Sequence, residues 1–326
     1  MATIEAVGLS KRYGSKQAVE ELSFRVDPGS VTGFLGPNGS GKSTTMRLML
    51  GLDNGEGSTT FDGQPFRSLR DPMRHVGALL EAKPFHPTRS ARNHLRLLAG
   101  SNGIADARCD EVLEMVGLTA VAKGKPKKFS LGMGQRLGIA AALLGDPHTL
   151  ILDEPANGLD PQGIQWLRSL LKDLAGHGRS VFVSSHLLAE MALMADRLVV
   201  IGRGRLIASG PVEDFIKSSR NNAIVLRSPD IERLGPILGE SGAYVQGQAD
   251  GSFVVTGMGR EQIGDLAHQH NARLHELSSR GATLEEAFLE ATGMSEEYVG
   301  HPGGLSGPPG SDGAGGQPAG QAGQPR

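Results

Sequence analysis

The sequence predicts an α/β fold whose core is a largely parallel sheet, and three observations carry that prediction. Short apolar runs with strand character alternate with helical segments along much of the chain. A glycine-rich loop follows the run Val31–Leu35 and leads into a helical segment, and the run at residues 149–152 ends in two acidic residues. Both arrangements are typical of sheets that bind ligands at the carboxyl ends of their strands.

The elements of this fold are expected in a definite order. Short strands should occupy most of residues 1–60, and residues 90–145 are mostly helical in pattern. Further on, two apolar runs flank Gly202-Arg203-Gly204 and predict a hairpin. The strands are expected at residues 4–7, 18–20, 22–26, 31–35, 59–63, 150–152, 181–185, 198–201 and 205–208.

We expect three parts in the chain. A large α/β domain should cover residues 1–220, and a small α+β domain should cover residues 221–295. The small domain is predicted from strands at 223–226 and 253–256 and helices at 231–238, 260–267 and 284–291. Residues 296–326 are rich in Gly and Pro and have too little apolar surface to offset the entropy of ordering, so we expect a disordered tail.

Composition narrows the classes of function. The formal net charge of the 326 residues is −2, so no broad basic field attracts nucleic acid, and we expect no nucleic-acid partner. The single cysteine, Cys109, excludes an internal disulfide and fits a reducing cytosol, where we expect an inert thiol. The sequence has no apolar run of about 18 residues and begins without a signal segment. Work at a membrane would therefore need a second chain.

The glycine-rich loop has the pattern G-x-x-x-x-G-K-S of a phosphate-binding P-loop. Its glycines let backbone N–H groups converge on a phosphate, and the positive end of the following helix points at the same anion. Lys42 should reach the β- and γ-phosphates, and the Ser43 hydroxyl should bind Mg²⁺. A glycine-rich turn without a ligand is the alternative. The predicted nucleotide-binding residues are Gly36, Pro37, Asn38, Gly39, Ser40, Gly41, Lys42, Ser43 and Thr44.

Asp153 and Glu154 end the apolar run Thr149-Leu150-Ile151-Leu152. A strand of this kind leaves its carboxylates at the edge of the sheet where ligands bind. We expect Asp153 to hold Mg²⁺, directly or through water, and Glu154 to polarise the attacking water. The alternative is an ordinary acidic pair between a strand and a loop, which the upstream P-loop disfavours.

A segment between these motifs, Phe129-Ser130-Leu131-Gly132-Met133-Gly134-Gln135-Arg136, resembles the L-S-G-G-Q-x-Q-R signature of the ATP-binding-cassette (ABC) ATPases. Asn157-Gly158-Leu159-Asp160 is similar to the D-loop of that family, and His186 is similar to its switch histidine. Tyr13 stands where the family stacks an aromatic ring on adenine. The resemblance covers about residues 2–220.

The resemblance implies a P-loop cassette with a mostly parallel core, an antiparallel β subdomain and a helical subdomain. Two cassettes would form a head-to-tail homodimer or heterodimer, with ATP between the P-loop of one chain and the signature of the other. Ser130, Gly132 and Gln135 would then act in trans, while Glu154 serves as the base and His186 contacts the γ-phosphate. The cofactors implied are ATP and Mg²⁺.

Several positions depart from the family pattern. Glu81 replaces the Q-loop glutamine, and its carboxylate could still bind Mg²⁺. Leu131 and Met133 replace a signature glycine and glutamine, and Asn157 replaces a D-loop serine. Because Ser130 and Gly132 persist, we expect an active ATPase; a regulatory or degenerate cassette is the alternative.

The resemblance favours the ATP-hydrolysing subunit of an ABC transporter that exports its substrate, such as a drug or antibiotic. Glu81 and residues 283–289 resemble the bacterial drug and antibiotic export branch. The partner would be a separately encoded transmembrane permease, which contacts residues 80–95. The chain would then lie peripherally at the cytoplasmic face of the cell membrane.

Two other classes remain as alternatives. A soluble ABC-type ATPase that acts on the ribosome or on DNA is disfavoured, because the chain has one P-loop and no long coiled coil between Lys42 and Ser130. A P-loop kinase or GTPase would leave residues 129–136 without a role. The basic run at residues 123–128 is expected to be a solvated surface, with contact to a partner or lipid headgroups as the alternative.

Overall fold

The computed structural model describes residues 3–81, 85–86, 88–219 and 223–293. Its central feature is a six-stranded sheet with the order β10-β9-β3-β8-β7-β6. All neighbouring strands run parallel except the edge strand β10, which is antiparallel to β9, so the predicted α/β class is confirmed. The strands are β3 (Ser30–Leu35), β6 (Val76–Leu79), β7 (Thr149–Leu152), β8 (Ser180–Ser184), β9 (Arg197–Gly202) and β10 (Arg205–Pro211).

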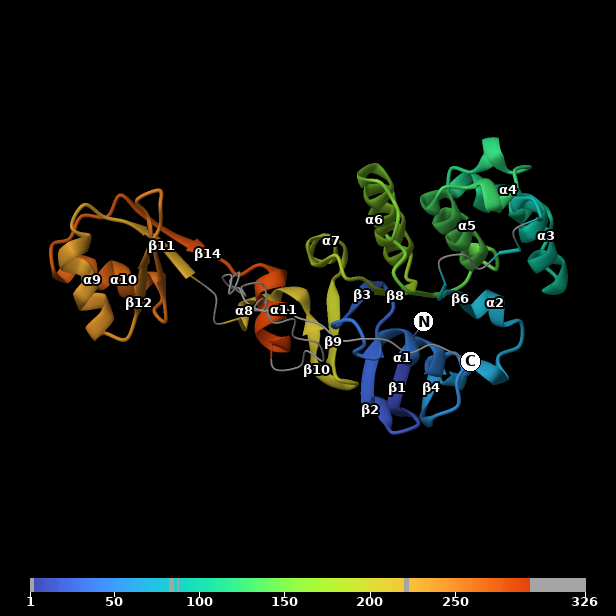
Figure 1. The fold of residues 1–326 in the computed structure, drawn as a ribbon, viewed down its shortest axis with the longest axis horizontal. Helices are drawn as coiled ribbons and strands as arrows, with labels where there is room; N and C mark the ends of the chain where they lie inside the picture. Colours follow the sequence, from blue (N-terminus) through green and yellow to red (C-terminus); the bar gives the residue numbers. More distant parts are fainter. Residues whose placement is uncertain (1–2, 82–84, 87, 220–222, 294–326) are drawn as a thin grey trace, which may run out of the picture. The chain divides into compact units, whose positions relative to one another are not determined.

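The two faces of this sheet pack into different hydrophobic cores, because successive side chains of a strand point to opposite sides. Val181 and Val183 of β8 join the core formed with the helices, whereas Phe182 joins the core beneath the antiparallel sheet. The rings of Phe34 and Phe182 lie 4.9 Å apart between their centroids. Figure 1 shows α6 (Pro161–Gly176) and α7 (Leu188–Met194) on the first side and β1, β2 and β4 on the second.

The antiparallel sheet has the order β2-β1-β4-β5 and confirms the predicted β subdomain. Its second strand is continuous, although the sequence predicted two separate strands at 18–20 and 22–26. Glu21 between them has a φ of 46°, a local irregularity that the strand accommodates without ending. The strands are β1 (Ile4–Tyr13), β2 (Lys16–Val26), β4 (Glu56–Phe61) and β5 (Gln64–Pro65), and α1 (Lys42–Met49) packs against three of them.

The predicted helical region contains three main helices, α3 (Ala91–Ser101), α4 (Ala107–Met115) and α5 (Leu131–Leu143). Arg92 of α3 donates hydrogen bonds to Asp110 of α4 at 2.7 and 2.8 Å and one to Asp106 at 3.1 Å, and so joins the two helices. The short turns η2 (Thr119–Val121) and η3 (Pro126–Lys128) lie within this region, whereas η1 (Phe66–Ser68) and α2 (Pro72–His75) precede it.

The predicted hairpin is formed by β9 and β10. Its two-residue turn consists of Arg203 and Gly204, whose φ values of 49° and 80° both lie in the left-handed region. This is the geometry that a tight hairpin requires, because its twist matches that of the flanking strands. The hairpin is followed by α8 (Val212–Lys217).

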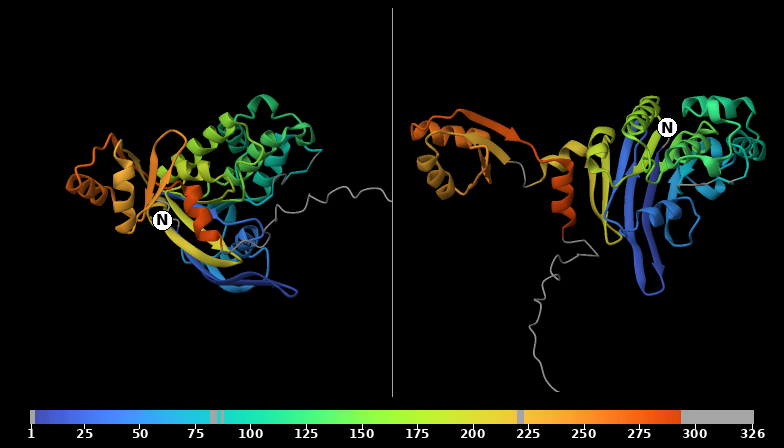
Figure 2. Two further views of the ribbon diagram at one scale, coloured as in Figure 1. Left: turned by 60° about the vertical axis from the view of Figure 1, so that its left-hand side comes forward. Right: turned by 45° about the horizontal axis from the view of Figure 1, so that its top comes forward.

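A small α+β unit with its own core follows the large domain (Figure 2). Its strands form an antiparallel sheet with the order β12-β13-β11-β14, and the chain order is βαββαβ. The elements are β11 (Ala223–Arg227), α9 (Ile231–Glu240), β12 (Tyr244–Gly247), β13 (Phe253–Thr256), α10 (Arg260–Gln269) and β14 (Glu276–Arg280). Strands β12 and β14 were not predicted, because few of their side chains are apolar.

The last described helix, α11 (Leu284–Thr292), packs against α7 and α8. Its Leu284 and Phe288 belong to the same hydrophobic core as the helices of the large domain. Ser219 Oγ also donates a hydrogen bond to Glu290 at 2.7 Å. The sequence had grouped residues 284–291 with the small domain, since neighbouring elements usually pack together. The predicted disordered tail at 296–326 lies outside the described residues.

Candidate functional site

The glycine-rich loop connects β3 to α1 in a tight path. Gly41 has a φ of 105°, and a Cβ atom on it would lie 2.4 Å from the carbonyl oxygen of Ala18 in β2. A Cβ on Gly36 would lie 2.4 Å from Ser40 Oγ and 2.6 Å from the carbonyl oxygen of Ile201. These contacts leave no room for a side chain, so the loop depends on glycine at both positions.

Lys42 lies at the start of α1 and is 8% exposed. Its Nζ donates hydrogen bonds to the carbonyl oxygen of Gly36 at 2.6 Å and to that of Pro37 at 3.3 Å. Burial lowers the pKa of Lys42, and the carboxylates of Glu154 and Asp153 oppose that shift. The loop therefore encloses one positive charge near two negative ones, an arrangement that suits a bound anion with a metal ion.

The two acidic residues directly follow β7, as predicted. Ser184 Oγ at the end of β8 donates a hydrogen bond to Asp153 Oδ1 at 2.5 Å and accepts one from the Glu154 N–H at 2.9 Å. Glu154 has a φ of 49°, in the left-handed region. His186 Nδ1 lies 2.7 Å from Glu154 Oε2 and donates to it, because a carboxylate can only accept. The adjacent parallel strands β7 and β8 thus bring these side chains together.

An open pocket of about 390 Å³ joins the loop to the acids. It brings together three parts of the chain that lie far apart in the sequence: Tyr13, most of the glycine-rich loop, and the carboxylates of Asp153 and Glu154. Glu81, Ser130, Gly132, Gln135 and His186 are not among its lining residues. The lining consists of Tyr13, Lys16, Ala18, Asn38, Gly39, Ser40, Gly41, Lys42, Ser43, Thr44, Asp153 and Glu154.

Tyr13 is half exposed at the rim of this pocket. Its hydroxyl donates a hydrogen bond to Asp53 Oδ2 at 2.8 Å, and that contact raises the pKa of Tyr13. Asp53 in turn pairs with Arg47 of α1 at 3.1 Å. Sequence analysis missed Asp53, because it follows α1 without any motif. These two contacts fix the ring relative to the helix that begins with Lys42.

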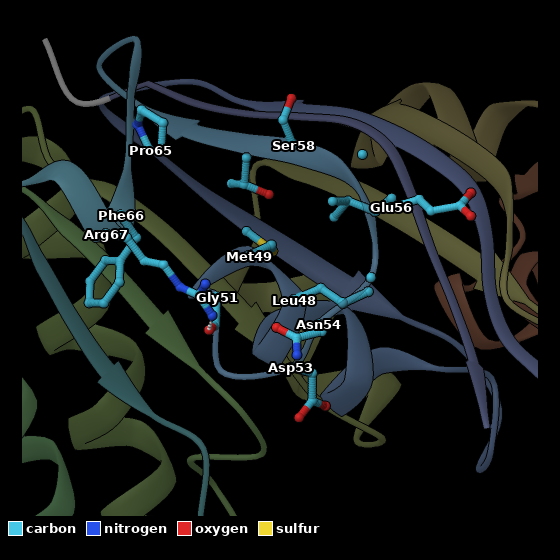
Figure 3. A pocket seen from close by; sticks show the side chains of 14 residues that line it. Leu48, Met49, Gly51, Asp53, Asn54, Glu56, Ser58, Pro65, Phe66 and Arg67 are labelled. Carbon is cyan, nitrogen blue, oxygen red and sulfur yellow. Dashed lines mark hydrogen bonds between the residues drawn. The ribbon is translucent and has the colours of Figure 1, made fainter.

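A second hollow, of about 280 Å³, lies at the opposite end of α1 (Figure 3). Leu48 and Met49 of α1 line it together with residues 53–59, and Arg67 reaches across to donate a hydrogen bond to the carbonyl oxygen of Gly51. None of the predicted site residues lines this hollow. Asp53, which holds the Tyr13 hydroxyl, is part of its wall.

Ser130 and Gly132 lie at the start of α5. Ser130 is the N-cap, and its Oγ accepts a hydrogen bond from the Met133 N–H at 3.2 Å. Gly132 packs closely on Gly158, since a Cβ on Gly132 would lie 2.8 Å from the carbonyl oxygen of Gly158. Leu131 is 45% exposed, and its side chain also packs on Gly158. Residues 129–136 and residues 157–160 of one chain are therefore in direct contact.

The position of Gln135 differs from the expectation that this residue acts in trans. Its side chain is 1% exposed, and its Nε2 donates a hydrogen bond to the carbonyl oxygen of Glu154 of the same chain at 2.9 Å. A second chain cannot reach a side chain that is enclosed in this way. The prediction for Gln135 is corrected accordingly, and its partner is the acidic residue at the end of β7.

Glu81 follows β6 and is exposed. The hydrogen bond and charge of Asp53 raise the pKa of Arg47, and the negative charge of Glu81 makes a smaller contribution in the same direction. In this chain alone, Glu81 does not join the pocket formed by the loop and the acids.

The chain is similar over most of its length to known proteins. It is 36% identical over 305 residues to the uncharacterized ABC transporter ATP-binding protein YhcH of Bacillus subtilis (strain 168), covering 91% of this chain and 98% of that protein. The chain belongs to the ABC transporter ATP-binding proteins. It therefore contains an ABC cassette that binds and hydrolyses ATP.

Other similarities agree with this cassette. A family model described as ABC transporter matches residues 19–157, an AAA-domain model matches residues 125–192, and a domain of unknown function matches residues 222–285. The bacitracin transport ATP-binding protein BcrA of Bacillus licheniformis is 40% identical over 237 residues, covering 68% of this chain and 78% of BcrA. The solved dimer of the bacterial ABC transporter cassette MJ0796 has a TM-score of 0.59 and 26% identity, and covers 64% of this chain and 98% of that one.

No helix in the described part of the cassette and the small unit is long and apolar enough to cross a membrane.

Proposed function

We propose that this cassette is the ATP-hydrolysing subunit of an ABC exporter whose permease is a separate chain. The observation that carries the proposal is the pocket that combines Lys42, Asp153 and Glu154, with His186 hydrogen-bonded to the Glu154 carboxylate. Similarity to BcrA, a bacitracin transport protein, favours export of a drug or antibiotic.

In the proposed reaction, residues 36–44 hold the triphosphate with backbone N–H groups and the Lys42 ammonium. Glu154 accepts the proton of the attacking water. His186 holds the Glu154 carboxylate by its Nδ1–H in the chain alone, and its exposed ring is then available to the γ-phosphate. Tyr13, at the rim of the pocket, stacks on adenine.

Mg²⁺ would neutralise charge on the phosphates when it is bound. Ser43 and Asp153 line the pocket with a hydroxyl and a carboxylate, the oxygen donors that this ion prefers. The described residues contain no cluster of three or more His, Cys, Asp or Glu that could hold a metal alone. This donor set suits an ion that takes its other ligands from phosphate and water, and Glu81 is a further candidate ligand.

We propose that two cassettes, from identical or related chains, assemble so that Ser130 and Gly132 of one face the ATP of the other. Ser130 supports this role, since it caps the first turn of α5, where backbone N–H groups point outward. The exposed Leu131 would lie in that interface. The solved MJ0796 cassette is dimeric.

The permease is proposed to bind residues 80–95, at the cytoplasmic face of the membrane. A tagged protein isolated from detergent-solubilised membranes is then expected to retain an integral membrane protein. Arg89→Glu, on the exposed part of this segment, should weaken that retention, whereas Arg260→Glu on α10 should not. Recovery without any integral membrane protein, combined with a salt-sensitive nucleic-acid gel shift, would instead favour the soluble ABC-type ATPase.

Glu81→Gln is expected to keep or raise ATPase activity. The amide retains an oxygen that can bind Mg²⁺ and removes a negative charge from the neighbourhood of the triphosphate. The measurement is the rate of phosphate release as a function of Mg²⁺ concentration. Complete loss of activity would show that the carboxylate itself is required.

A further inference from the structure

The backbone of Glu154 is held by two side chains on either side of the residue. Gln135 Nε2 donates to its carbonyl oxygen and Ser184 Oγ accepts from its N–H, both at 2.9 Å. The φ of 49° places Glu154 in a region that costs an L-residue about 1–2 kcal/mol. A conformation of this kind persists where the surroundings impose it. These two contacts hold the Glu154 backbone together with the Asn157 N–H, which donates to the same carbonyl at 3.2 Å, while His186 holds the carboxylate.

Stability alone does not account for a glutamine at position 135. Its Oε1 is buried and has no hydrogen-bond partner among the described residues, which costs about 1–3 kcal/mol. An apolar side chain of the same length would avoid that cost. Since the Glu154 carbonyl can only accept, the amide N–H must face it, and this N–H is what a hydrocarbon side chain lacks.

We propose that Gln135 is a positioning residue that fixes the backbone of Glu154 and links it to the signature end of α5. The proposal rests on the proposed role of Glu154 as the base. Gln135 lies in the second turn of α5, which begins directly after the N-cap Ser130. The helix rises about 1.5 Å per residue, so Ser130 and Gln135 are separated by little more than one turn. Over one turn a helix moves as a rigid unit.

The link joins the two ATP sites of the proposed dimer. Ser130 and Gly132 of a chain serve the ATP bound by its partner, while Glu154 of that chain serves its own ATP. Gln135, in the helix that Ser130 caps, contacts Glu154 itself. If α5 shifts when Ser130 and Gly132 bind the phosphate held by the partner, the backbone position of Glu154 changes too. The two ATP sites are then energetically coupled.

Gln135→Met tests the proposal, since it keeps the length of the side chain and removes both the donor and the orphan acceptor. We expect kcat to fall about tenfold and the Hill coefficient for ATP to fall towards one. The dissociation constant for a fluorescent ATP analogue and the melting temperature should change little. Gln269→Met on the exposed end of α10 is the matched control and should leave all four quantities unchanged.

Gln135→Glu provides a second measurement, the pH dependence of activity, which would not change if Gln135 were only structural. A carboxylate facing the Glu154 carbonyl is repelled, whereas a protonated carboxyl can donate to it, and burial favours the protonated form. Relative to wild type, the activity of this variant should recover as the pH falls from about 8 to about 6. A ratio independent of pH would contradict the proposal.

Comparison with Glu154→Gln separates this inference from the proposed function. If Glu154→Gln abolishes hydrolysis while Gln135→Met keeps the wild-type kcat, the positioning role is wrong and the role of Glu154 stands. If Gln135→Met lowers ATP affinity and melting temperature in parallel with kcat, Gln135 is structural and the inference is also wrong. If Glu154→Gln hydrolyses ATP normally, both roles are wrong.

Discussion

Glu154→Gln is expected to abolish ATP turnover while ATP stays bound. The amide keeps the shape of the side chain and its contact with His186 but cannot accept the proton of the attacking water, and loss of a general base typically lowers a rate by about 10²–10⁴-fold. Lys42 and the loop, which bind the triphosphate, are untouched. Phosphate release under steady-state conditions measures the loss, and a fluorescent ATP analogue measures the retained affinity.

The same variant should accumulate as a dimer with ATP, because hydrolysis is the step that opens the proposed sandwich. Size-exclusion chromatography with ATP and with ADP distinguishes the two states. Glu114→Gln, on the exposed surface of α4, is the matched control and should hydrolyse ATP as wild type does. A Glu154→Gln protein that turns over ATP at the wild-type rate would remove Glu154 as the base.

The parts of the site that were predicted from sequence depend on short-range patterns. A glycine loop between a strand and a helix, and acids at the end of an apolar strand, specify their own geometry through chain connectivity. Tyr13 and His186 required a family resemblance, since neither has a local pattern of its own. The structure brings Tyr13, Lys42 and Glu154 to one pocket.

The parts that were missed depend on contacts between residues distant in sequence. Asp53 anchors Tyr13, and Ser184 bridges Asp153 and Glu154, yet an aspartate after a helix and a serine at the end of a strand are common in any protein. Gln135 was assigned to a partner chain because its segment resembles a signature. Its burial on the inner side of α5 could not be derived from spacing alone.

Chain order also misled the grouping of α11. Leu284–Thr292 follows β14 directly, so the sequence placed it with the small unit. In the structure Phe288 joins the core of the cassette, and the helix begins at a capping box formed by Thr283 and Glu286. Residues near the helix start therefore determine where the helix begins, whereas residues distant in sequence determine the surface on which it packs.

Gly41→Ala is expected to destabilise the fold and to remove most of the ATP affinity. The residue has a φ of 105°, outside the range that L-residues readily adopt, and the new Cβ would lie 2.4 Å from the Ala18 carbonyl oxygen. Backbone strain of this kind costs about 1–3 kcal/mol, and the displaced loop adds the loss of aligned N–H groups. Losing two phosphate contacts of about 1.5 kcal/mol each corresponds to roughly a hundredfold lower affinity.

Gly100→Ala is the control that separates this effect from loss of a glycine as such. Gly100 lies in α3, has open space around its Cβ position and does not require a positive φ, so alanine should stabilise the helix by about 0.5–1 kcal/mol. Urea unfolding gives the stability of both variants, and titration with a fluorescent ATP analogue gives their affinity. Wild-type affinity in Gly41→Ala would mean that the loop between β3 and α1 tolerates the shift, and that the phosphates are held chiefly by Lys42 rather than by the backbone. If Gly41→Ala loses ATP affinity and Gly100→Ala does not, ATP binding depends on the close contact of this loop with β2.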